Sequence, residues 1–386
     1  MSRMFNIAVV GCGAMAQGMH LPNVARHPGI HLRWCCDVDH KTLDHVATTY
    51  HPDRTTTNIA EIAADKECDA AIVATHPAGR LEIVRTLAAA GKHIYAEKPI
   101  ADNFADMLSI QQIVKKTGIV FTVGHNRRMA PALREARDIY RNHRDHPQSE
   151  PWRWDRVGAR RPRLPQEQQT CMLQRINDDS LSWKEWVFQE KAGALLLELN
   201  HFSDLACYFI EREPVLVSAT GDAIMNVVVN ITFADGSLGV IFDACTGTFG
   251  YPKELCEIYQ GGAVIAVDHC MEVRTAGIPG QPFRRVYPSA TDPAVAGIEA
   301  WYDRTIEAMR KPVDPRFPLA APGPNKGHFE LLDAFVRACR NEGENPCDAV
   351  AGTRAAAIVL KAEESLRRGG APRKMEAADY VAETVR

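Results

Sequence analysis

The sequence of 386 residues lacks the features that mark several common classes of protein. It has no apolar run close to the roughly 20 residues that a membrane-spanning helix needs, so it does not indicate a membrane protein. Its formal net charge is only −3, which gives no electrostatic reason to expect nucleic acid or an anionic membrane as the main partner. Internal repeats and low-complexity tracts are also missing. What is left is the composition of an ordinary globular enzyme.

Paired cysteine motifs are missing as well. The chain has eleven cysteines, an odd number, and no CxxC pair, so their spacing indicates neither a zinc site nor a disulfide framework. Cys12, Cys36, Cys207 and Cys245 stand in apolar sequence context, where buried, reduced thiols are expected. The start, MSRMFNIAVVGCG, runs into a predicted strand with no signal-peptide pattern. We therefore expect a cytoplasmic protein.

The length suits two domains rather than one core. Residues 5–124 alternate almost wholly apolar runs with amphipathic segments, as in a parallel sheet covered by helices on both faces. Strands are expected at 5–10, 30–36, 69–75, 93–97 and 118–123. Helices are expected at 14–27, 39–50, 58–66, 79–92 and 105–117. This alternation predicts a doubly wound α/β domain over residues 1–124.

Residues 125–386 follow a different pattern. The segment 141–182 is rich in Arg, Pro, Gln and Asp, and it is expected to hold an exposed strand at 152–160 and then a long irregular loop, which extends to about residue 190. A helix is expected at 193–210. Strands are expected at 214–221, 226–247 and 254–268, and helices at 295–310 and 326–367. This order predicts an α+β domain with a mostly antiparallel open sheet.

The first motif with chemical meaning is VVGCGAMA at 9–16, which places Gly11, Gly13 and Ala16 in a GxGxxA pattern between a strand and a helix. The glycines let the backbone turn tightly and approach a pyrophosphate, which the N-terminus of the helix can bind. The second strand ends at Asp37, where a carboxylate binds the ribose hydroxyls and repels a 2′-phosphate. The motif predicts a Rossmann domain that prefers NAD to NADP. A glycine turn without a ligand is the alternative.

A second motif, KHIYAEKPIA at 92–101, ends a predicted strand with Glu97, Lys98 and Pro99. The carboxyl ends of parallel strands face the ligand crevice of such a sheet, and Pro99 fixes φ and has no N–H. A lysine there can donate a hydrogen bond to a substrate hydroxyl and stabilise the alkoxide that forms as hydride leaves. The alternative is an ordinary surface lysine.

The predicted helix at 193–210 carries Glu198, His201 and Asp204 on an otherwise almost wholly apolar segment. Charged groups in such a segment need partners or a function, because burying them alone is costly. His201 is the natural general base or acid near neutral pH, and one of the two carboxylates would orient it. A hydrogen-bonded core histidine is the alternative. A metal site is the weaker hypothesis, because no further ligand cluster is evident.

Taken in order, GxGxxA, EKPIA, GHNRR at 124–128 and the helix with His201 and Asp204 resemble the Gfo/Idh/MocA oxidoreductases. The resemblance covers most of residues 5–367, and EKP is its most specific element. It implies NAD(P) in a Rossmann domain, a sugar or cyclitol as substrate, and a homodimer or homotetramer formed through the second domain's sheet. It implies Lys98 and His201 as the catalytic pair. The cofactor-binding residues that we predict are Gly11, Gly13, Ala14, Met15, Asp37, Thr75, His76, Glu97, Lys98 and Asn126.

The chain departs from the family pattern at two places. Many members carry Asp four residues before the histidine, where this chain has Leu197, so Glu198 is expected to replace it. Some members read T-P-N-x-x-H after the fourth strand, where this chain reads THPAGR and ends on Arg80. Arginine there favours an anionic substrate such as a sugar acid. The predicted substrate-binding residues are Lys98, His201, Arg80, Arg127 and Trp183, of which Trp183 either stacks on a sugar face or packs locally.

These residues predict an NAD-dependent dehydrogenase of a small carbohydrate or polyol. His201 takes the hydroxyl proton, Lys98 polarises the oxygen, and Glu198 or Asp204 orients His201. Two alternatives stay open. One is an NAD-dependent glycosidase that oxidises C3 transiently and ends with no net redox change, and the other is a non-catalytic NAD-binding sensor. No metal, nucleic acid or membrane partner is expected.

Overall fold

The computed structural model describes residues 3–146, 169–177, 193–223, 226–248, 250–310 and 322–383. They form two compact units, and each unit is built from separate stretches of the chain. Unit 1 comprises Met1–Asn126, Gly327–Ala357 and Glu376–Arg386, and unit 2 comprises Arg127–Lys326 and Ile358–Met375. The first boundary lies close to the predicted one at residue 124. The structure differs from the predicted continuous second domain, 125–386, because two C-terminal segments return to unit 1.

Unit 1 contains a six-stranded sheet in the order β3-β2-β1-β4-β5-β6, with all neighbours parallel. The strands are β1 (Phe5–Val10), β2 (Ile30–Cys36), β3 (Arg54–Thr56), β4 (Ala70–Val73), β5 (His93–Ala96) and β6 (Phe121–Val123). This is the Rossmann order, which reverses between β1 and β4 and places the ligand crevice at the carboxyl ends of those strands. The predicted doubly wound parallel sheet is confirmed, although β3 was not predicted.

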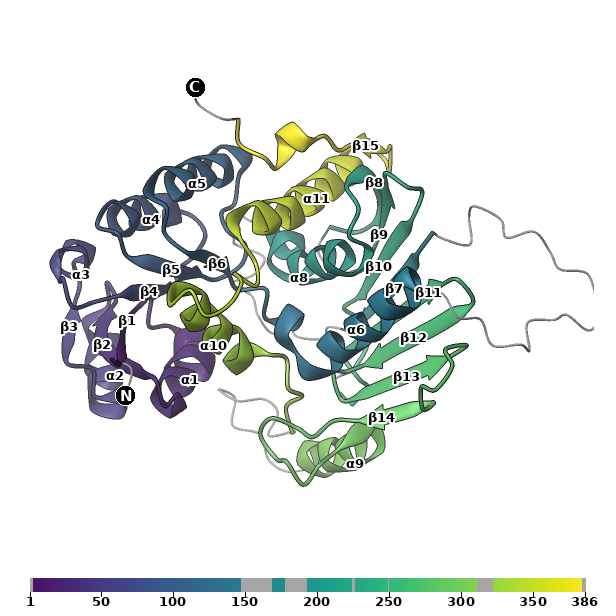
Figure 1. The fold of residues 1–386 in the computed structure, drawn as a ribbon, viewed down its shortest axis with the longest axis horizontal. Coiled ribbons are helices and arrows are strands. Elements are labelled where there is room, and N and C mark those ends of the chain that lie inside the picture. The colour runs from purple at the N-terminus through teal and green to yellow at the C-terminus, as the bar shows by residue number, and fades with distance from the viewer. Residues whose placement is uncertain are drawn as a thin grey trace, which may run out of the picture. The chain divides into compact units, whose positions relative to one another are not determined.

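Helices cover both faces of this sheet (Figure 1). They are η1 (Ala16–His20), a π-helix continued by α1 (Leu21–Arg26), then α2 (His40–Tyr50), α3 (Ile59–Ala64), α4 (Arg80–Ala89), α5 (Phe104–Thr117) and α10 (His328–Cys339). The side chains of Asp39 and Asn103 cap the first turns of α2 and α5 by accepting backbone N–H bonds. Every residue of β4 and β6 is buried, as expected for strands covered on both faces.

The C-terminal return to unit 1 has a packing reason. Phe335 on α10 places its ring edge-on to Phe5 of β1, with ring centroids 6.5 Å apart, and lies 5.9 Å from the ring of Tyr95 on β5. The backbone N–H of Val123 donates to the carbonyl of Cys347 at 2.8 Å, beside the outer strand β6. These segments therefore complete the core around the first sheet. Their amphipathic sequence pattern predicts a helix, but it does not say against which sheet the helix packs.

Unit 2 contains a nine-stranded sheet in the order β14-β13-β12-β11-β7-β10-β9-β8-β15. The strands are β7 (Cys171–Asn177), β8 (Pro214–Gly221), β9 (Asn226–Phe233), β10 (Leu238–Ala244), β11 (Glu254–Gln260), β12 (Ala263–Asp268), β13 (Glu272–Ala276), β14 (Arg284–Val286) and β15 (Arg373–Lys374). The neighbours are antiparallel except for β10 and β7, which are parallel. The predicted α+β domain with a mostly antiparallel sheet is confirmed.

Helices pack against this second sheet. They are α6 (Pro131–Asp145), α8 (Gly193–Ile210), α9 (Gly297–Met309) and the later part of α11 (Ala349–Arg367). Helix α6 packs on β12 and β13, and α8 packs on β7 and β10. The Nε2 of Gln174 on β7 donates to the carbonyl of Phe202 on α8 at 2.8 Å. Because side chains alternate along a strand, Leu173 faces away from α8 and is exposed.

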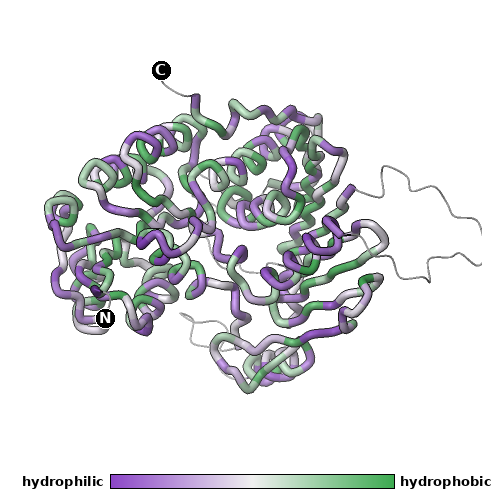
Figure 2. The backbone as a smooth tube through the Cα atoms, viewed as in Figure 1, coloured by the Kyte–Doolittle hydropathy of each residue, from purple (hydrophilic) through white to green (hydrophobic). Residues whose placement is uncertain are grey.

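Part of the predicted loop at 141–190 is regular structure. Strand β7 lies within it and forms the centre of the nine-stranded sheet, so the prediction of an irregular segment there was wrong. The strand expected at 152–160 falls outside the described residues. Figure 2 shows hydrophobic stretches along the strands and helices of both units. All eleven cysteines are free, and nine of them are buried, which confirms the predicted buried thiols. Within the described ranges, no helix is long and apolar enough to cross a membrane.

Candidate functional site

The glycine turn after β1 has the geometry that a dinucleotide requires. Gly11 has a φ of +83°, and a Cβ there would lie 2.9 Å from the backbone of Ala74 and Thr75, so only glycine fits. A Cβ on Gly13 would meet nothing within 4 Å, which leaves open space in front of the helix that follows. The backbone N–H of Gln17 makes the first helical bond, to Gly13 at 3.0 Å. The N–H groups before it are therefore available to an anion.

Asp37 lies directly beside this turn. Its Oδ2 accepts a hydrogen bond from the backbone N–H of Cys12 at 2.7 Å, and its Oδ1 accepts one from the N–H of Asp39 at 3.0 Å. The carboxylate is thus held at the end of β2 while the residue stays partly accessible to solvent. A fixed carboxylate next to the pyrophosphate turn is the arrangement that binds the adenosine ribose of NAD.

Thr75 and His76 follow β4 on the other side of the glycine turn. The Thr75 hydroxyl is buried and has no hydrogen-bond partner among the described residues. His76 is exposed. A buried hydroxyl without a partner is costly, and a ligand at the carboxyl ends of β1 and β4 would supply one. The turn, Asp37 and Thr75 therefore fit a bound dinucleotide, and the places of Ala14, Met15 and His76 against it stay predictions.

The segment Glu97-Lys98-Pro99 follows β5 at the same carboxyl edge of the sheet. Glu97 is buried, its Oε1 lies 2.9 Å from Nε2 of His20, and its Oε2 accepts the backbone N–H of Lys98 at 3.2 Å. Burial alone would raise the pKa of Glu97, but the hydrogen bond from His20 and the charges of His20 and Lys98 more than offset it and hold the pKa at about 2. Lys98 itself is half-buried, and its peptide bond to Pro99 is cis.

Arg80 has a different environment from the predicted one. Its side chain is buried, and its guanidinium donates to the backbone carbonyls of Thr75, Glu97 and Pro99. Burial lowers the pKa of Arg80 to about 10, an effect that Glu97 partly opposes. The bonds to the backbone use Nη1 and Nη2, whereas the buried Nε has no hydrogen-bond partner among the described residues. Substrate binding by Arg80 stays a prediction.

In unit 2, His201 lies on α8 and is buried. The two carboxylates expected to orient it each form an ion pair. Oε1 of Glu198 lies 2.7 Å from Nζ of Lys253. Asp204 is fully buried, and its two oxygens accept bonds from Nε and Nη2 of Arg128 at 2.8 and 2.6 Å. The catalytic roles of His201, Glu198 and Asp204 stay predictions.

Arg127 is also part of a buried ion pair. Its Nε and Nη2 donate to Glu254 at 2.8 and 2.6 Å, and Nζ of Lys326 reaches the same carboxylate at 2.6 Å. Burial alone would raise the pKa of Glu254, but Arg127 and Lys326 hold it well below its ordinary value. The predicted contact of Arg127 with substrate stays a prediction. Asn126 is buried, and its predicted cofactor contact is untested.

Lys98 belongs to unit 1 and His201 to unit 2, so their convergence over a nicotinamide ring stays a prediction. Trp183 and the arginines between residues 153 and 163 lie outside the described residues. Sequence reasoning missed the pairs His20–Glu97, Arg128–Asp204 and Arg127–Glu254. One signal was available: a carboxylate such as Glu97, placed directly after a buried strand, needs a cationic or hydrogen-bonding partner.

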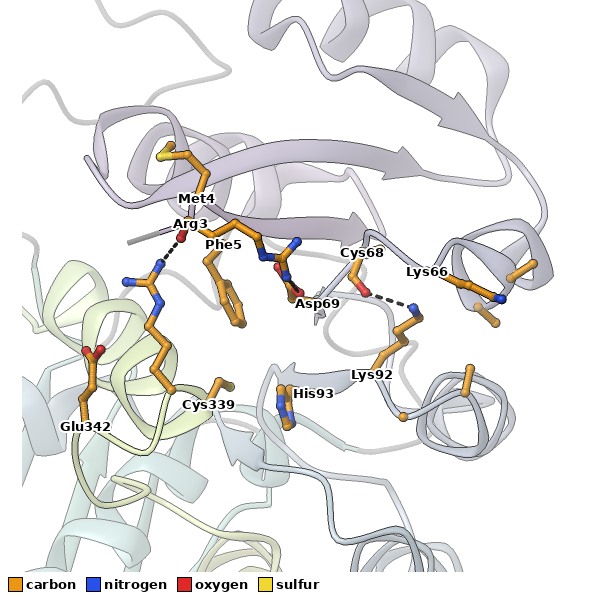
Figure 3. Close-up of a pocket in the computed structure, with 15 residues that line it drawn as sticks. Arg3, Met4, Phe5, Lys66, Cys68, Asp69, Lys92, His93, Cys339 and Glu342 are labelled. Carbon is orange, nitrogen blue, oxygen red and sulfur yellow. Dashed lines mark hydrogen bonds and ion pairs between the residues drawn. The ribbon is translucent and has the colours of Figure 1, made fainter. Parts of the chain in front are cut away.

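A cavity of about 850 Å³ opens at the opposite edge of the first sheet (Figure 3). It lies at the amino ends of the strands, next to Phe5 and His93. Its polar groups largely bond within the protein: Arg3 pairs with Asp69, and Lys92 donates to backbone carbonyls, including that of Cys68 at 2.9 Å. Because ligands of such sheets bind at the carboxyl edge, this cavity is separate from the candidate site.

Comparison with known proteins agrees with this geometry. Residues 5–125 match the model of the GFO_IDH_MocA oxidoreductase family with its NAD-binding Rossmann fold. For residues 5–125, this match confirms the predicted family and the predicted cofactor, NAD. Its range ends between the end of β6, at Val123, and the end of the first stretch of unit 1, at Asn126.

Relatives extend the similarity into unit 2. An uncharacterized oxidoreductase, YrbE, of Bacillus subtilis (strain 168) is 22% identical over 292 residues, which are 72% of this chain and 78% of that protein. An inositol 2-dehydrogenase of Rhizobium meliloti (strain 1021) is 22% identical over 346 residues, 85% of this chain and 95% of that protein. A solved scyllo-inositol dehydrogenase from Lactobacillus casei, with bound NAD(H) and scyllo-inositol, has a TM-score of 0.71 at 15% identity, covering 96% of this chain and 99% of that chain. The last comparison establishes the fold.

Proposed function

Because residues 5–125 belong to the Gfo/Idh/MocA oxidoreductase family with its NAD-binding Rossmann fold, we propose that this chain is an NAD-dependent dehydrogenase of a small polyol. The reaction would oxidise a secondary alcohol of a sugar, sugar acid or cyclitol, or reduce the corresponding ketone. The observation that carries the proposal is the placement of Lys98 at the carboxyl edge of the same sheet that holds Asp37 and the glycine turn.

The substrate class rests on two kinds of support. The inositol dehydrogenases among the similar proteins favour a cyclitol or sugar. Arg80, which first suggested an anionic substrate, is bonded to the backbone of the protein itself, and Arg127 is bonded to Glu254, so a neutral polyol is favoured over a sugar acid. The comparisons give no support to the glycosidase alternative, and no observation of the site favours it.

Each polar residue has one task in the proposed reaction. NAD, when bound, supplies the acceptor for the hydride that leaves the carbinol carbon. His201 accepts the hydroxyl proton as general base, and the Lys98 ammonium donates a hydrogen bond to the oxygen as its negative charge develops. The pairs Glu198–Lys253 and Asp204–Arg128 lie three residues before and after His201 and hold the helix that carries it.

The outer face of the second sheet is the proposed assembly surface. Leu173 on β7, Leu238 and Phe242 on β10, and Tyr259 on β11 are each roughly 40% exposed, and these three strands are neighbours in the sheet. Side chains of this size gathered on one exposed face are typical of a protein interface. We propose that a second copy of the chain covers them in a homodimer or homotetramer.

Replacing Lys98 tests the proposed reaction directly. Wild-type protein is first assayed with inositols, aldoses and sugar acids in the presence of NAD or NADP, following the absorbance of the reduced nicotinamide. With the best substrate, Lys98→Ala is expected to lose turnover by at least about a hundredfold, the scale of one positioned proton-transfer group. NADH affinity should stay within a few-fold, because the ribose and pyrophosphate contacts are intact.

Lys66→Ala is the matched control, since Lys66 is an exposed lysine that lines the cavity at the opposite edge of the sheet. It should behave as wild type. Unchanged turnover in Lys98→Ala would remove Lys98 from the mechanism. Tight NADH binding with no turnover on any substrate would favour the non-catalytic sensor instead.

A further inference from the structure

Arg80 is a buried cation whose bonding differs from that of the other buried arginines described above. It is only 1% exposed, yet within the described part of the chain no carboxylate accepts its donors. Instead, Nη2 donates to the carbonyl of Thr75, and Nη1 donates to the carbonyls of Glu97 and Pro99. Burying a guanidinium without a bonded carboxylate is costly. Stability of the fold alone therefore does not account for a buried arginine at this position. The three carbonyls that Arg80 binds indicate which segments it holds in place.

The three accepting carbonyls lie on two neighbouring loops. Thr75 follows β4, while Glu97 and Pro99 follow β5, and β4 and β5 are adjacent parallel strands. One planar guanidinium thus ties the ends of both strands together, at the edge where the ligand of a Rossmann sheet binds. Arg80 can span both loops because it begins α4, the helix that connects them.

Lys98 lies between the two carbonyls that share Nη1. The peptide before it and the residue after it are both held by the same nitrogen. The Glu97 side chain is held separately, because it bonds to His20 at 2.9 Å and accepts the Lys98 N–H. The backbone of Lys98 is therefore fixed relative to β4 by Arg80, while its side chain stays half-buried at the site.

We propose that Arg80 is a positioning residue for the reaction: it holds the Lys98 backbone, together with Thr75, at the distance from the cofactor that proton and hydride transfer need. This inference rests on the proposed role of Lys98. Guanidinium geometry is essential to it, because a planar fork can address carbonyls on two loops at once, whereas a lysine ammonium is a compact charge on a flexible stem.

The test compares Arg80→Lys and Arg80→Gln with Arg85→Met. Arg85 lies on the same helix, is exposed, and pairs with Glu82 at 3.2 Å, so its loss should leave every parameter unchanged. For the Arg80 variants we expect kcat to fall roughly 10- to 100-fold, the effect of misplacing a reacting group by about 1 Å. The KM for the polyol and the Kd for NADH should change less than about threefold, because the groups that bind them are retained.

A pH profile separates positioning from general loosening of the fold. If Arg80 sets the place of the lysine ammonium, the alkaline limb of kcat should move in Arg80→Lys and stay in place in Arg85→Met. If both Arg80 variants keep the wild-type kcat and the wild-type position of the alkaline limb of the pH profile, the inference is overturned. Insoluble variants would also overturn it, and so would an NADH affinity that falls in step with kcat, since Arg80 would then serve the stability of unit 1.

These outcomes are distinct from failure of the proposed function. If Lys98→Ala keeps full turnover, the reaction itself has been misassigned and Arg80 has nothing to position. If Lys98→Ala is inactive while Arg80→Lys is fully active, the reaction stands and only the positioning role is lost.

Discussion

At the scale of single residues, the carboxylate of Asp37 is a half-buried part of the proposed cofactor contact. The two backbone N–H groups that hold it, from Cys12 and Asp39, fix its direction beside the glycine turn. Removing this carboxylate is therefore expected to lower the affinity for NADH more than it lowers the stability of the fold.

Asp37→Ala is therefore predicted to weaken NADH binding. Losing charge-assisted hydrogen bonds to the ribose costs about 1.5–3 kcal/mol, or roughly 10- to 100-fold in Kd. Fluorescence titration with NADH measures this change in Kd. The matched control is Asp39→Ala, which removes the cap of α2 and should lower the unfolding temperature with little change in Kd. Equal NADH affinity before and after the Asp37 change would undo the ribose assignment.

Single residues also show which parts of the site could be predicted from the sequence and which could not. Asp37 and Gly11 were predictable because each satisfies a spacing rule tied to the end of a strand. The environments of Arg80 and Arg127 could not be predicted from the sequence. An arginine in a polar motif looks the same in the sequence whether it binds a ligand, a buried carbonyl or a buried carboxylate. Only the three-dimensional positions of Pro99 and Glu254 distinguish these cases.

At the scale of elements, the start of β11 is tied to two other segments by one buried carboxylate. Glu254 accepts bonds from Arg127, which lies on the short helix η2 (Asn126–Met129), and from Lys326. Two cations share it, so its removal leaves both uncompensated. This makes Glu254 a strong test of what stabilises unit 2.

Glu254→Gln is predicted to lower the free energy of unfolding by about 3–5 kcal/mol, the cost of breaking a buried ion pair. Because the folded pKa of Glu254 is depressed, its contribution is fully present above the unfolded value of about 4.3 and is lost only as pH falls below it. Urea unfolding of wild type should therefore weaken in acid more than that of the variant.

Glu257→Gln is the control for this prediction, because Glu257 lies on the same strand and is only half-buried. It should unfold at nearly the same urea concentration as wild type. A Glu254→Gln protein as stable as wild type at neutral pH would contradict this prediction. It would show that the desolvation penalty of the buried ion pair is as large as the stabilisation that the pair contributes.

The elements themselves were predictable where local pattern matches environment. Strands β1 and β2 and helix α8 begin and end at the predicted residues, because continuous apolar runs and helical periodicity report burial directly. Strand β7 was missed because its sequence, CMLQRIN, alternates weakly and lies in a charged stretch. The return of α10 to unit 1 was also missed, since periodicity says that a face is buried but not against what.

At the scale of the whole molecule, the face of the nine-stranded sheet that carries Leu173 and Phe242 is the proposed assembly surface. Register pairs Leu173 with Val240, and Phe242 with Val228, across neighbouring strands. These apolar side chains form a band that the polar Glu257 and Arg175, which stand opposite Leu173 and Phe242, interrupt. A band of this kind loses water contact when a second copy packs on it, which favours association.

Phe242→Lys is predicted to break the assembly, because it places an ammonium at the centre of that band at a residue that is 41% exposed in the monomer. Light scattering coupled to size-exclusion chromatography should show a smaller mass than wild type at the same concentration. Tyr302→Lys is the matched control, since Tyr302 is an aromatic of similar exposure on α9, and its mass should equal that of wild type. A wild-type protein that is already monomeric, or a Phe242→Lys protein of unchanged mass, would show that this face is not the interface.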